Sequence, residues 1–230
     1  PAPKTETTES TLTGKDEEGN SYTQYERVDK TTSVEMIKDT KTISKSGSAD
    51  IVFVVDRSLS MKSNIDTVRD NVNKFVDNLA NNGVTARFGL ATFSDELYGR
   101  TYNLTDEGTI LTKFGDSYFT SNPDELKKAL AAIELANGGD PAETPTPALN
   151  QIVSTYDWSK SPKNKRFAVL LSDFPIKENP SIPTIADTIA TLTANGIERI
   201  VATSSPYQKY YKGFTNDNRI LDLSEQFGDT

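Results

Sequence analysis

The sequence predicts an α/β fold of the doubly wound, Rossmann-like kind, in which helices flank a mostly parallel central sheet. Two observations support this prediction. From residue 50 onward, strand-like segments alternate with helical patterns. In addition, the runs at 51–55 and 167–171 are continuously apolar, with β-branched and aromatic residues. Such runs are typical of parallel strands that helices bury on both faces.

The first 48 residues differ from the rest of the chain. Residues 1–20 are rich in Thr, Glu, Lys and Gly, and Leu12 is their only large aliphatic residue, so we expect a disordered linker or tail. Residues 21–48 contain short alternations with Thr and Val, which predict a β-rich extension of a few flanking strands. The Ser46-Gly47-Ser48 step marks the boundary, and 49–230 forms the main domain.

Helix and strand signals follow the first apolar run in order. Apolar residues at helical spacing predict a helix over about 62–82, which Gly83 ends as a C′ residue. A strand at 84–93 follows, and a shorter edge strand is plausible at 98–104.

The second half of the chain begins with a clear helix start. Asn122 is placed as an N-cap, Pro123 takes the first helical position, and Glu125 is the third. The expected elements are a helix at 123–136, a helix with Thr146 as its N-cap, a strand at 167–171, a helix at 182–194, a strand at 197–202 and a final helix near 220–227.

Composition excludes several classes of function. The formal charge of −8 disfavours a nucleic-acid partner, and no apolar run reaches the roughly 18 residues needed to span a membrane. The chain has no Cys and no His. It therefore cannot form disulfides, a Ser-His-Asp triad, a Cys-His dyad or a His-ligated zinc site. A hydrolase built on this chain would need carboxylates, Lys, Tyr or a metal.

The segment Asp56-Arg57-Ser58-Leu59-Ser60 follows the first apolar strand directly. Ligands of open α/β sheets bind beyond the carboxyl ends of the strands, and this segment offers only hard oxygen donors there. Such donors suit Mg²⁺, with Mn²⁺ or Ca²⁺ as alternatives. Asp173 follows the second buried strand and should reach the same edge. The alternative is that Asp56 and its serines cap the following helix.

A Gly-rich loop over 137–145 brings Glu143 and Thr144 to the start of a helix. With these residues the chain resembles, over about 50–203, the von Willebrand factor A domain with its metal-ion-dependent adhesion site. The resemblance implies that Ser58 and Ser60 coordinate the cation directly and that Asp residues bind it directly or through water. It also implies an open coordination position for an acidic side chain of a partner.

The resemblance leaves two candidates for the ligand from the second loop. Counting back from the Ala148-Leu149 pair, the family's position falls on Glu143, whereas Thr144 has the commoner ligand chemistry. Glu143 would strengthen cation binding but weaken attraction for an acidic partner, and Thr144 is slightly favoured.

The resemblance predicts a non-enzymatic adhesion module. Its partner would be a host extracellular-matrix or cell-surface protein, or a glycan. Its location would be the surface or pilus of a Gram-positive bacterium. Three tyrosines after the last strand, Tyr207, Tyr210 and Tyr211, could form a ligand-binding rim, or they could simply pack the loop.

Two alternative functions remain at this point. A Mg²⁺-dependent phosphoryl hydrolase would use Asp56 as its nucleophile, as haloacid-dehalogenase-like phosphatases use an Asp after a strand. The chain resembles that family only in this Asp, because the family has a second acid two residues on, where Ser58 stands. An intracellular A domain that assembles a larger machine would share the fold and the cation and would differ in partner and location.

Overall fold

A computed structural model describes residues 4–15, 21–32, 47–97, 108–136, 142–217 and 219–223. The chain divides into two compact units, Pro1–Lys45 and Ser46–Thr230, and each is described by itself. The strand expected at 98–104 lies outside the described residues, as do residues 137–141 of the Gly-rich loop and residues 224–227 of the expected last helix.

The first unit contains a ribbon of two antiparallel strands, β1 (Lys4–Lys15) and β2 (Ser21–Thr32). Their pairing runs without interruption from Lys4 opposite Thr32 to Lys15 opposite Ser21. The expectation of disorder over 1–20 is therefore wrong for Lys4–Lys15, and 21–32 is one long strand rather than several short ones. The repeated β-branched Thr residues favour extended backbone, and the pairing of the two strands satisfies the hydrogen bonds of that backbone.

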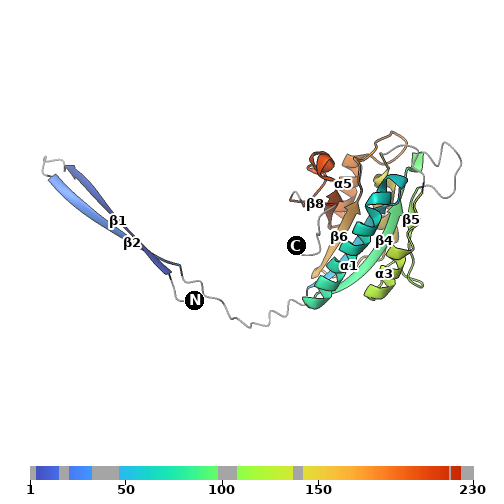
Figure 1. Cartoon of the computed structure of the whole chain (residues 1–230), viewed down its shortest axis with the longest axis horizontal. Coiled ribbons are helices and arrows are strands. Elements are labelled where there is room, and N and C mark those ends of the chain that lie inside the picture. Colours follow the sequence, from blue (N-terminus) through green and yellow to red (C-terminus); the bar gives the residue numbers. More distant parts are fainter. Residues whose placement is uncertain are drawn as a thin grey trace. The chain divides into compact units, whose positions relative to one another are not determined.

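The second unit is built on a six-stranded sheet with the order β5-β4-β3-β6-β7-β8 (Figure 1). Strand β5 runs antiparallel to β4, and every other neighbouring pair is parallel. The strands are β3 (Ser48–Asp56), β4 (Thr85–Phe93), β5 (Ile110–Leu111), β6 (Asn164–Leu171), β7 (Ile197–Thr203) and β8 (Ile220–Asp222). The predicted α/β class is confirmed, but Ile220–Asp222 is a strand rather than the start of a helix.

Three of the predicted helices are shorter than expected: the helix at 62–82 begins at Ile65, the helix at 123–136 ends at Ala131, and the helix at 182–194 begins at Ile185. The helices are η1 (Leu59–Ser63), α1 (Ile65–Asn81), α3 (Pro123–Ala131), α4 (Pro145–Thr155), α5 (Ile185–Ala194) and η2 (Ser205–Tyr211). Helix α4 begins earlier than predicted, with Thr144 rather than Thr146 as its N-cap. Both Pro145 and Pro147 suit a first helical position, and the earlier one occupies it. None of the helices within the described segments is long and apolar enough to cross a membrane.

Local helix signals behave as predicted at two ends. The Asn122 side chain accepts a hydrogen bond from the Asp124 backbone N–H at 3.0 Å and so caps α3. Gly83 follows the last turn of α1 with φ +71°, a conformation that a side chain disfavours.

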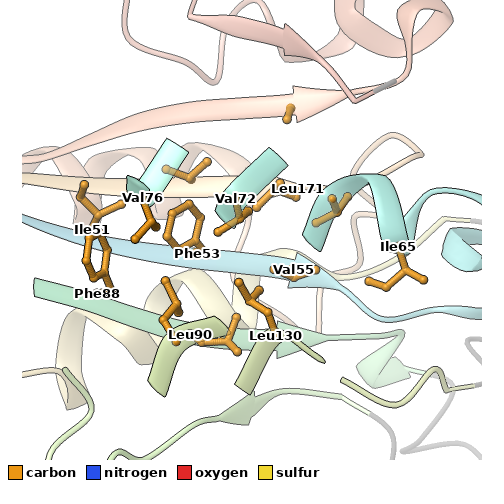
Figure 2. Packing of buried hydrophobic residues seen from close by; sticks show 14 of the residues in the cluster. Ile51, Phe53, Val55, Ile65, Val72, Val76, Phe88, Leu90, Leu130 and Leu171 are labelled. Atoms are coloured by element: carbon orange, nitrogen blue, oxygen red, sulfur yellow. The ribbon is translucent and has the colours of Figure 1, made fainter. Parts of the chain in front are cut away.

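The core occupies both faces of the sheet, because alternate residues of β3 point to opposite sides. Ile51, Phe53 and Val55 pack against α1 and α3 (Figure 2). Val52 and Val54 join the other cluster, which α4 and α5 cover. Strand β3 is thus buried on both faces, and packing on both sides fixes the position of its carboxyl end.

Candidate metal site

The candidate site lies at the carboxyl edge of the sheet, where β3 and β6 end side by side. Asp56 is the last residue of β3, and Ser172 and Asp173 follow β6 directly. In the parallel register of the two strands, Val55 pairs with Leu171. Asp56 follows Val55 and Ser172 follows Leu171, so these two residues lie side by side and the two loops begin next to each other.

Hydrogen bonds and one close contact between hydroxyl oxygens link four of the six predicted ligands. Asp56 Oδ1 accepts from the Ser58 backbone N–H at 2.9 Å and from Ser58 Oγ at 2.6 Å. Ser58 Oγ lies 2.9 Å from Ser60 Oγ, which donates to Asp173 Oδ1 at 3.0 Å. These two carboxylates and two hydroxyls converge at one point on the sheet edge and provide the hard oxygen donors that a cation such as Mg²⁺ prefers.

Ser172 is a fifth member of this cluster that the sequence reasoning missed. Its hydroxyl donates to Asp56 Oδ2 at 2.7 Å, so both carboxylate oxygens of Asp56 are held in position. The signal was a hydroxyl residue directly before Asp173, but its significance depends on the register between β3 and β6.

The surroundings of Asp56 and Asp173 raise the pKa of both carboxyl groups. The pKa of Asp56 is raised to about 6, mainly by burial and to a smaller extent by the nearby Asp173 charge, while hydrogen bonds from Ser58 and Ser172 oppose the rise. Burial also raises the pKa of Asp173 above its ordinary value, against hydrogen bonds from Ser60 and Asn64. In both groups burial outweighs the hydrogen bonds that favour the ionised form, and a divalent cation would favour that form.

The second loop is held close to the loop that follows β4. Glu143 and Thr144 are both buried. The Thr144 hydroxyl accepts from the Glu96 backbone N–H at 2.8 Å and donates to the Ser94 carbonyl at 3.2 Å. Within the described segments no three Asp, Glu, His or Cys side chains gather as a cation cluster, so Glu143 does not join Asp56 and Asp173 in one. The choice between Glu143 and Thr144 stays open.

The three predicted rim tyrosines have different environments. Tyr211 is 1% exposed and its hydroxyl donates to the Phe174 carbonyl, so its prediction as a rim residue is wrong. Tyr207 is half-buried against the Phe174 ring, and Tyr210 is 60% exposed. In a 3₁₀-helix residues three apart share a face, which groups Tyr207 with Tyr210 and directs Tyr211 to the core.

A doubly wound α/β domain with oxygen donors at the carboxyl edge of its sheet is an architecture suited to binding ligands at that edge. The sequence matches the von Willebrand factor type A domain family over residues 50–219, and the chain therefore belongs to this family. Domains of this family generally mediate protein–protein interactions and adhesion.

Solved structures with the same fold include two of proximal thread matrix protein 1 (PTMP1) from the mussel byssus. The first, crystal form 2, has a TM-score of 0.58 and 18% identity over 78% of this chain and 45% of that chain. The second has a TM-score of 0.57 and 19% identity over 77% and 44%. This chain thus spans less than half the length of the mussel protein, and the likeness concerns the fold alone. Among curated proteins, none matches the sequence.

Proposed function

We propose that this domain is a non-enzymatic adhesion module that binds a protein partner through a divalent cation at the carboxyl edge of its sheet. The observation that carries the proposal is the continuous chain of oxygen donors from Asp56 through Ser58 and Ser60 to Asp173. When bound, the cation supplies a coordination position that a carboxylate of the partner can occupy. Mg²⁺ suits these donors best, and Mn²⁺ or Ca²⁺ are alternatives.

The residues of the cluster have separate roles in this proposal. Ser58 and Ser60 bind the cation through their hydroxyl oxygens, and Asp56 and Asp173 contribute negative charge. Ser172 holds the Asp56 carboxylate in orientation, because it donates to the oxygen that Ser58 leaves free. Such supporting hydrogen bonds fix the geometry of metal ligands in proteins.

The adhesion proposal includes an extracellular setting, on the surface or pilus of a Gram-positive bacterium, and a host protein as partner. Three features of the composition support this setting: the sequence has no Cys, its N-terminal stretch is rich in Thr and Lys, and its formal charge is −8. The absence of His and Cys also supports a binding role over a catalytic one, since the chain lacks the usual general bases and nucleophiles.

Cation binding and adhesion can be tested together. Calorimetric titration with MgCl₂ should give a saturable signal that Asp56→Ala abolishes. Binding to a panel of immobilised extracellular-matrix proteins should require Mg²⁺ and disappear in EDTA. The matched control is Asp70→Ala, because Asp70 is an exposed carboxylate on α1. If Asp56→Ala bound the panel like the unmodified protein, the metal mechanism would be wrong.

The same titration distinguishes the two candidates of the second loop. Glu143→Gln removes a charge, and Thr144→Val removes a hydroxyl while keeping the shape of the side chain. The variant that weakens Mg²⁺ binding identifies the ligand. Because the Thr144 hydroxyl also bonds Glu96 and Ser94, a thermal melt of each variant separates loss of the cation from loss of the loop.

A further inference from the structure

Strongly exposed apolar side chains border the candidate cation site. Among the residues that the structure describes, three large hydrophobic side chains stand out: Leu59 is 52% exposed, Tyr210 is 60% exposed and Ile110 is 48% exposed. Leu59 lies in η1, between the predicted ligands Ser58 and Ser60. Tyr210 lies in η2, which follows the carboxyl end of β7. Two of the three are therefore on loops that a partner would meet when it approaches the cation.

Tyr210 is connected to the site by a row of aromatic rings. Phe174 directly follows Asp173, and its ring centroid lies 4.6 Å from that of Tyr207. The Tyr207 and Tyr210 centroids are 6.4 Å apart. The buried Tyr211 hydroxyl donates to the Phe174 carbonyl and fixes η2 to the same loop. The exposed ring is therefore presented on a supported surface, which lowers the entropy cost of a contact.

Positive charge accompanies these apolar side chains. Lys62 in η1 and Lys209 in η2 are exposed. Neither forms an ion pair with any residue of the described segments. The whole chain carries a charge of −8, so unpaired lysines at this edge run against its overall charge. Together with a bound cation they complement an acidic partner and disfavour a basic one.

We propose that this edge recognises an acidic protein segment in which an apolar residue neighbours the carboxylate that reaches the cation. Leu59 and Tyr210 provide the apolar contact, and Lys62 and Lys209 attract further acidic residues. The proposal deepens the proposed function and rests on it. It adds the chemical class of the partner and the residues that select it.

A protein segment fits this surface better than a glycan does. Leu59 has no polar atom in its side chain and offers a sugar no hydrogen bond. The Lys209 ammonium lies 5.0 Å from the Tyr210 ring centroid, over the ring face on which a sugar would stack. An apolar side chain from a peptide can instead pack against the Leu59 side chain and the exposed edge of the Tyr210 ring.

A phage-displayed peptide library with one fixed Asp between randomised positions tests the proposal on the full chain in MgCl₂. Selection should enrich apolar residues next to the fixed Asp, with additional acidic residues nearby. The double variant Leu59→Ser/Tyr210→Ser should bind the selected peptides about tenfold or more weakly, the scale of loss at an interface hot spot. Its Mg²⁺ titration should be unchanged. The control is Ile110→Ser, which replaces a comparably exposed side chain. Ile110 lies on β5, the outermost strand on one side of the sheet, whereas η2 contacts β8, the outermost strand on the other side.

Each other outcome contradicts a defined claim. Three outcomes overturn the inference: enriched peptides without an apolar preference, no enrichment at all, or full affinity of the double variant for the selected peptides. In each case, Mg²⁺-dependent binding of the domain to the matrix-protein panel would leave the proposed function standing. Peptide binding that survives both EDTA and Asp56→Ala overturns the proposed function itself. Binding of acidic glycans on an array, lost in the double variant while peptides fail to bind, would replace the protein partner with a glycan.

Discussion

At the scale of single residues, Asp56 links the stability of the domain to its proposed cation. The side chain is fully buried. Burial raises its pKa from the ordinary 3.8 to about 6. The folded protein without a cation therefore binds a proton at Asp56 more tightly than the unfolded chain does. Proton binding by Asp56 therefore stabilises the folded protein. This stabilisation is complete below the pKa of Asp56 in the unfolded chain and is lost as the pH rises through its pKa in the folded protein.

This linkage predicts opposite pH dependences with and without Mg²⁺. In EDTA, the Asp56 contribution to the free energy of unfolding should fall by up to about 3 kcal/mol between acidic and neutral pH. In MgCl₂ the stabilisation by the cation should grow over the same range, because only the ionised carboxylate binds it. Urea unfolding at several pH values from about 3 to 7 covers the change from below the unfolded pKa to above the folded pKa and measures both effects.

The control for this measurement is Asp56→Asn, which cannot ionise. In EDTA the variant should gain stability relative to the unmodified protein as the pH rises, and Mg²⁺ should have no effect on it. An unmodified protein whose difference from Asp56→Asn stays constant with pH in EDTA would contradict the prediction. That result would mean that Asp56 keeps an ordinary pKa in the folded state.

At the scale of elements, Gly89 in β4 allows Tyr156, at the end of α4, to pack directly on the sheet. The Tyr156 hydroxyl donates to the Leu90 carbonyl at 2.8 Å, and its ring contacts those of Phe119 and Trp158. A Cβ atom at position 89 would lie 2.5 Å from Tyr156 Cε1, closer than real atoms approach. This contact fixes the end of the helix whose first turn carries the second loop of the candidate site.

The prediction is that Gly89→Ala destabilises the domain by about 1–3 kcal/mol, the usual cost of overpacking a core. Gly47→Ala is a matched control, because nothing lies within 4 Å of a Cβ at that position. Thermal unfolding of the two variants measures the difference. Equal melting temperatures for both variants would show that Tyr156 moves aside at little cost.

Sequence patterns predicted the elements whose signals are local. The apolar runs of β3 and β6 and the Asn122 cap depend on neighbours along the chain, and the structure contains all three. Strand β1 was missed because its order comes from pairing with β2 rather than from apolar residues.

In the candidate site too, the residues with local sequence signals were predicted, and those that depend on contacts distant in the sequence were not. Asp56, Ser58 and Ser60 belong to one local motif, and the structure brings them together with Asp173 as predicted. The role of Ser172 depends on a contact with a residue 116 positions away, which no local pattern reveals. Tyr211 was misjudged because its burial depends on how η2 turns back onto the Phe174 carbonyl.

At the scale of the whole molecule, the division into two units predicts that residues 46–230 fold without residues 1–45. Both hydrophobic clusters consist of residues from Ala49 onward. The free energy of unfolding of the shorter chain should lie within about 0.5 kcal/mol of that of the full chain, because both hydrophobic clusters are retained. Its Mg²⁺ titration should also be the same as that of the full chain.

A second truncation that begins at residue 60 serves as the control. It removes β3 (Ser48–Asp56), which lies in the centre of the sheet, and should not fold. Circular dichroism and urea unfolding of the three chains test this. A 46–230 chain that is unfolded, or that loses Mg²⁺ binding, would mean that the first unit is part of the fold of the second.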